Sequence, residues 1–137
     1  MSADFPGLNA SEFQTLTPAD VELQLRYLGR EISLAQKENA EIEMDFSKAK
    51  AELEIAMAKV RLHYANVSKP GGKNYTADER TDLAITENSD ALLAVAILEA
   101  RIKASRGRIN KLNTQTDIVR SVSTSVRSSM ATETGRG

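Results

Sequence analysis

The sequence predicts an all-α fold: a long N-terminal helix with a coiled-coil-like seam, packed with shorter C-terminal helices in an oligomeric helical bundle or ring. When residues 21–64 are numbered in heptads, nearly every a and d position is apolar or small. The composition is poor in aromatic residues, at 4%, and no segment alternates with period two. Because a lone helix cannot bury such a seam, we expect other helices to cover it.

Copies of the chain are expected to supply part of that cover, because a chain of this composition has a thin core of its own. Secondary apolar positions beside the seam favour a bundle or ring over a two-stranded coiled coil. The candidate oligomerisation residues are Leu25, Leu28, Ile32, Ile42, Phe46, Leu53, Val60, Ile118, Val119, Val122 and Val126.

The long helix is predicted over residues 17–65, where Thr17 can cap its start and Asp20 meets the positive helix end. Gly29 either softens this helix or divides it into two. Asn39 falls at an a position, where a polar residue either sets the register or marks a loose point in the bundle.

The rest of the chain is predicted from turn and capping signals. Pro70-Gly71-Gly72 indicates a flexible basic loop, and Thr76 with Glu79 forms a capping box that opens the next helix. A helix break is expected at residues 87–90. The predicted parts of one helical domain, residues 1–137, are an N-terminal arm (1–16), the long helix (17–65), the basic loop (66–75), C-terminal helices (76–130) and a tail (131–137).

Several functional classes have no support in the composition. The chain has no Cys, one His and no Glu-x-x-His pair, so we expect no catalytic site, no metal site and no cofactor. His63 fits a packed or half-exposed side chain better than a catalytic base. No apolar run approaches the roughly 20 residues of a membrane span, and the start lacks a positive signal-peptide region. We therefore expect a cytoplasmic protein that does not enter membranes.

Charge is unevenly distributed along the chain. Residues 1–100 hold 10 Lys and Arg against 17 Asp and Glu, whereas residues 101–137 hold 8 against 2. Such a split indicates either an acidic half meeting a basic half between subunits or a surface for a polyanion. The basic residues from Arg101 to Lys111 accordingly either contact DNA or pair with the acidic first helix of a neighbouring subunit. The candidate DNA-binding residues are Lys59, Arg61, Tyr64, Lys69, Lys73, Arg106 and Arg108.

The residues at the end of the predicted long helix resemble a motif of a known family. Residues 59–64 have the form K-x-R-L-x-Y and precede a Gly-containing loop and an acid-capped helix. This order resembles the UvsY-type recombination mediators of T-even-like bacteriophages, from about Glu41 to the C-terminus. The chain departs from them in its low pI of 5.9 and its Ser/Thr-rich last helix, and both departures bear on DNA affinity and ring stability.

The resemblance implies rings of several subunits that bind single-stranded DNA. It also implies help in loading a RecA-like recombinase onto strands covered by single-strand-binding protein, in the host cytoplasm if the chain is phage-encoded. Lys59 and Arg61 take the places of the family's DNA contacts, and the last helix takes the place of its assembly helix. The alternatives are a phage structural, scaffold or adaptor protein and a small inhibitor of a host defence protein.

Overall fold

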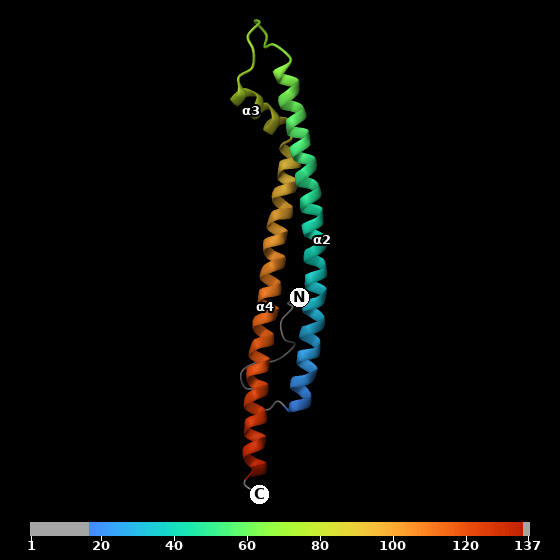
Figure 1. The fold of residues 1–137 in the computed structure, drawn as a ribbon, viewed down its shortest axis with the longest axis vertical. Helices are drawn as coiled ribbons and strands as arrows, with labels where there is room; N and C mark the ends of the chain where they lie inside the picture. The colour runs from blue at the N-terminus through green and yellow to red at the C-terminus, as the bar shows by residue number, and fades with distance from the viewer. Residues whose placement is uncertain (1–16, 136–137) are drawn as a thin grey trace. The chain divides into compact units, whose positions relative to one another are not determined.

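The computed structural model describes residues 17–135 (Figure 1). Side chains are described for residues 17–129. The all-α prediction is confirmed, because this part of the chain contains three helices and no strand. The predicted arm and the last two residues of the predicted tail lie outside the described residues. The helices are α2 (Pro18–Ala65), α3 (Ala77–Glu87) and α4 (Ser89–Gly135).

Thr17 caps the start of α2, as the sequence predicts, and Asp20 makes this cap reciprocal. The Thr17 backbone N–H donates to Asp20 Oδ2 at 3.0 Å, and the Asp20 backbone N–H donates to Thr17 Oγ1 at 3.2 Å. These bonds satisfy backbone donors that a helix start leaves without partners. The pKa of the Asp20 carboxyl is lowered chiefly by the Thr17 backbone bond. Gly29 does not divide α2, which continues to Ala65.

The chain forms two compact units. Unit 1 consists of Met1–Asn39 and Ala104–Gly137, and unit 2 of Ala40–Lys103. Both long helices contribute to each unit, while the loop after α2 and the whole of α3 belong to unit 2.

In unit 1, the first part of α2 packs against the second part of α4. Buried Val21, Leu28 and Ala35, spaced by seven residues, form one core cluster with Leu112 and Val119. The partly buried residues packed against this cluster are Leu25, Tyr27, Ile32 and Ile109. This stretch of the predicted seam is therefore covered by the same chain, because α4 presents a heptad-spaced apolar row of its own.

Unit 2 has a smaller core. Its buried apolar residues, among those described, are Leu53 of α2, Ala84 of α3 and Ile102 of α4. The capping box at α3 is confirmed: Thr76 Oγ1 accepts from the Glu79 backbone N–H, and a Glu79 carboxylate oxygen accepts from the Thr76 backbone N–H. The predicted break at 87–90 is also confirmed, because α3 ends at Glu87, Asn88 is its C-cap, and α4 begins at Ser89.

The loop between α2 and α3 is a hydrogen-bonded turn, and this differs from the flexible loop that its composition predicts. The Lys69 backbone N–H donates to Lys73 O at 2.7 Å, and the Gly72 N–H donates to Lys69 O at 3.0 Å. Gly71 and Gly72 have φ of 100° and 86°, which side chains disfavour, so two glycines allow the chain to reverse here.

The last helix, α4, forms although its sequence is rich in Ser and Thr. Hydroxyl groups along α4 donate to the backbone carbonyl four residues earlier, as Thr116 does to Leu112 at 2.9 Å and Thr124 to Arg120 at 3.1 Å. Their hydrogen-bonding capacity is thus met within the helix, and packing of Leu112 and Val119 supplies the stability that propensity lacks. As a result α4 is one helix that extends beyond the predicted end at residue 130.

Candidate nucleic-acid interface

Two cations of the K-x-R motif lie at the exposed end of α2 in unit 2. Lys59 and Arg61 are both exposed, and the described residues offer neither of them a hydrogen bond or an ion pair. Residues two apart on an α-helix are separated by about 200° around its axis. The two side chains therefore leave different sides of α2, which the spacing in the sequence already implies.

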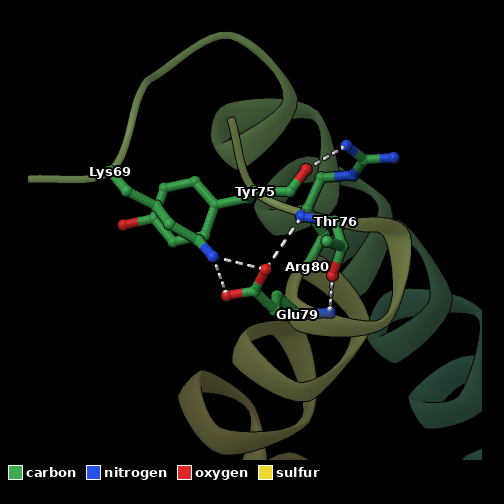
Figure 2. A network of polar contacts seen from close by, with 5 residues as sticks. All are labelled: Lys69, Tyr75, Thr76, Glu79 and Arg80. Atoms are coloured by element: carbon green, nitrogen blue, oxygen red, sulfur yellow. Dashed lines mark hydrogen bonds and ion pairs between the residues drawn. The ribbon is translucent and has the colours of Figure 1, made fainter. Parts of the chain in front are cut away.

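Lys69, a third candidate, is neutralised within the loop. Figure 2 shows its ammonium group against both carboxylate oxygens of Glu79, and it lies 5.7 Å from the centre of the Tyr75 ring. The same carboxylate accepts the Thr76 backbone N–H at 3.1 Å. Lys69 and this backbone bond lower the pKa of the Glu79 carboxyl. Lys69 thus holds the loop onto the start of α3 and has little charge to offer a ligand.

Lys73 differs from Lys69 although both flank the same glycines. Its side chain is exposed and makes no hydrogen bond or ion pair with the described residues. Its backbone carbonyl closes the turn by accepting from Lys69. The turn therefore fixes the backbone of Lys73 while leaving its ammonium group in solvent.

The aromatic side chains of this region pack on one another. Tyr64 makes edge contacts with His63 and Tyr75, with ring centres 5.0 Å apart in both pairs. Its hydroxyl donates to Glu87 of α3 at 3.0 Å, and this bond raises the pKa of the Tyr64 hydroxyl. Tyr64, a predicted DNA-binding residue, is therefore half-buried and attaches α2 to α3.

Two basic residues of α4 in unit 1 that were predicted to contact DNA, Arg106 and Arg108, also have partners. Arg108 lies across two acidic residues of α2, with Nη2 3.3 Å from Glu31 and Nη1 3.3 Å from Glu38. Arg106 has an interaction partner as well. Arg108 thus pairs with the acidic first helix of its own chain, whereas the sequence predicted either DNA contact or pairing with the first helix of a neighbouring subunit.

The predicted oligomerisation residues occupy two kinds of environment. Leu28, Leu53 and Val119 are buried within the chain, whereas Ile118 is 49% exposed. The half-buried members of the set are Leu25, Ile32, Ile42, Phe46, Val60, Val122 and Val126. Self-association stays a prediction, because packing within one chain explains the buried members.

The sequence-based site omitted the acidic partners that decide which cations remain available. The sequence identifies Glu79 only as a capping residue and does not distinguish Glu31 or Glu87 from other acidic residues. One signal was present: a capping-box Glu ten residues after a Lys, across a turn, can bind both the backbone and the ammonium group. The contacts of Glu31 and Glu87 with residues far away in sequence had no local signal.

The described residues offer a cavity in unit 1 and no metal-binding group. Among the described side chains, residues 17–129, no three His, Cys, Asp or Glu are grouped so as to hold a metal ion. A cavity of about 340 Å³ in unit 1 lies between the start of α2 and α4, lined by Val21, Leu25 and Val126 among others. None of the described helices has a stretch long and apolar enough to cross a bilayer.

In comparisons of sequence and of structure, the chain matches no protein-family model, no curated protein and no solved structure.

Proposed function

We propose that this chain is a self-associating, non-enzymatic protein that binds single-stranded DNA and helps to load a RecA-like recombinase onto strands covered by single-strand-binding protein. The observation that carries the proposal is the set of exposed cations Lys59, Arg61 and Lys73 in unit 2, none of which is paired within the described residues. The K-x-R-L-x-Y resemblance supports the same assignment. The proposed setting is the cytoplasm of a host cell.

The contact proposed is with phosphates rather than with bases. The aromatic rings nearest the motif already pack on one another, which leaves the cations as the groups available to a strand. Because Lys59 and Arg61 leave different sides of α2, one copy offers few simultaneous contacts. Association of several copies multiplies weak sites into tight binding through avidity, with strong dependence on salt.

Fluorescence anisotropy with a labelled single-stranded oligonucleotide tests the site. We expect Lys59→Ala/Arg61→Ala to weaken binding about tenfold at low salt and to make the salt slope shallower by roughly 1.4, at about 0.7 per phosphate contact. Lys69→Ala is the matched control, because that cation is already paired with Glu79. Unchanged affinity in the double variant, or an equal loss in the control, would reject the assigned site.

The loading activity needs a separate assay. Assembly of a purified RecA-like recombinase on strands precoated with single-strand-binding protein should be faster when the wild-type chain is present. The Lys59→Ala/Arg61→Ala variant should give less than half of that acceleration. Equal assembly rates with and without the chain would reject the mediator role while leaving DNA binding intact.

A second candidate is a structural or adaptor protein. It is favoured by the large apolar side chains that α2 exposes in unit 2, namely Met44, Ile55 and Leu62. This candidate predicts stoichiometric assembly without nucleic acid and no anisotropy change at moderate salt. Light-scattering mass measured with and without a short oligonucleotide separates the two functions.

A further inference from the structure

An apolar-basic pattern repeats along the part of α2 that belongs to unit 1. Leu23 and Leu34 are 64% and 49% exposed and lie eleven residues apart. Eleven residues make about three turns, so both side chains leave the same side of the helix. A cation follows each leucine at the third position, Arg26 and Lys37. This basic stripe, Leu23 to Lys37, lies about 140° around α2 from the buried seam residue Leu28.

The complementary pattern repeats along the part of α2 that belongs to unit 2. Met44 and Ile55 are 73% and 56% exposed and also lie eleven residues apart. Here a carboxylate precedes each apolar residue by three positions, Glu41 and Glu52. This acidic stripe, Glu41 to Ile55, therefore has the charge opposite to that of the basic stripe. Its charged and apolar residues also follow one another in the reverse order along the helix.

The reversed order fits antiparallel contact between two helices. In a single register, the basic stripe places Leu23 opposite Ile55, Arg26 opposite Glu52, Leu34 opposite Met44, and Lys37 opposite Glu41. We propose that the basic stripe of one copy binds the acidic stripe of a second copy of this chain in this antiparallel register. The proposal rests on the self-association in the proposed function and names the surface responsible for it.

The charged side chains of the basic and acidic stripes are available to form ion pairs between two copies. Lys37, Glu41 and Glu52 are exposed and make no hydrogen bond or ion pair with one another or with other described residues. Arg26 pairs with Glu22 on the same helix, but both side chains are more than 60% exposed, so the pair is weak and exchangeable. Arg30 would face Lys48 in this register, which leaves two opposite-charge pairs against one like-charge pair. Burial of the four apolar side chains is the main driving force.

Cysteine cross-linking tests the register directly, because the chain has no Cys. Leu34→Cys is mixed with a tagged Met44→Cys chain under mild oxidation, and the mixed dimer is resolved by mass. The control mixture pairs Leu34→Cys with tagged Ile55→Cys, which lies about 16 Å further along the helix. We expect at least about five times more mixed dimer in the first mixture, since a disulfide needs Cα atoms within about 7 Å. Equal yields would overturn the proposal.

Charge reversal tests the same register without thiols. Lys37→Glu or Glu41→Lys alone should weaken self-association about fivefold in sedimentation, and the double variant should regain most of it. A double variant as weak as either single one would contradict the pairing. Oligonucleotide anisotropy on the same proteins keeps the two proposals apart: failed cross-linking with intact DNA binding rejects only this interface, and the reverse result rejects only the DNA function.

Discussion

Lys69 donates to both carboxylate oxygens of Glu79, ten residues further along the chain, and the same carboxylate caps α3 (Figure 2). One acidic side chain therefore serves the helix start and the turn that precedes it. This arrangement turns a glycine-containing loop into a fixed connection, and it removes one cation from the set available to a polyanion.

Removing that ammonium group should loosen the connection. We expect Lys69→Ala to lower the free energy of unfolding by about 0.5–1 kcal/mol, because the pair is partly exposed and screened. Amide hydrogen exchange should rise in residues 69–80 in particular. Lys73→Ala, on the other side of the glycines, is the control and should leave exchange unchanged. Equal exchange in the two variants would contradict the bracing role of Lys69.

Acid should weaken the same region. The folded state lowers the pKa of the Glu79 carboxyl below its ordinary 4.5, so this group stabilises the fold above that pH. The contribution starts to fall as the pH approaches 4.5 and is lost below the lowered value. Asp20, whose ordinary pKa is 3.8, acts in the same direction at the start of α2. Melting temperatures between pH 7 and pH 3 should fall less steeply in Glu79→Gln, and an unchanged slope would count against the assignment.

The core of unit 1 depends on few side chains. Leu28 is fully buried in the cluster with Leu112 and Val119, so Leu28→Ala should lower the free energy of unfolding by about 2–4 kcal/mol. Leu93→Ala, at a position 61% exposed in unit 2, should change it by less than about 0.5 kcal/mol. Urea denaturation followed by circular dichroism measures both. Similar losses at the two positions would contradict the burial of Leu28 in the core of unit 1.

Arg108 should act on stability more than on DNA affinity. Its guanidinium contacts Glu31 and Glu38, so Arg108→Ala should cost about 1 kcal/mol of unfolding free energy, and Arg108→Lys should recover only part of it. Affinity for a single-stranded oligonucleotide should change less than twofold. A loss of affinity as large as that of Lys59→Ala/Arg61→Ala would return Arg108 to the DNA-binding set.

The cap of α3 provides a local test. Thr76 Oγ1 accepts the Glu79 backbone N–H at 3.2 Å, so Thr76→Ala should destabilise the helix by about 1 kcal/mol. Thr76→Ser keeps the acceptor and should behave like the wild type. Helix content and hydrogen exchange of α3 measure the difference between the two variants. Identical behaviour of Thr76→Ala and Thr76→Ser would contradict the capping role of Thr76.

The sequence by itself determined the helices and where they begin. Capping and turn signals around Thr17, Thr76 and Pro70 act within a few residues, so they are legible without a structure. The heptad pattern likewise identified the apolar face of α2. It could not say whether α4 or another copy covers that face, because both partners satisfy the same pattern.

Only the tertiary structure decided which charges remain available for binding. Arg108 is paired with residues 70 and 77 positions away, and Tyr64 with Glu87, so no local pattern separates them from exposed Lys59 and Arg61. An ionic contact depends on the distance between two side chains after packing. That distance cannot be known from the number of basic residues in a segment. The helices follow from local chemistry, whereas the binding surface follows from which side chains the packed helices bring together.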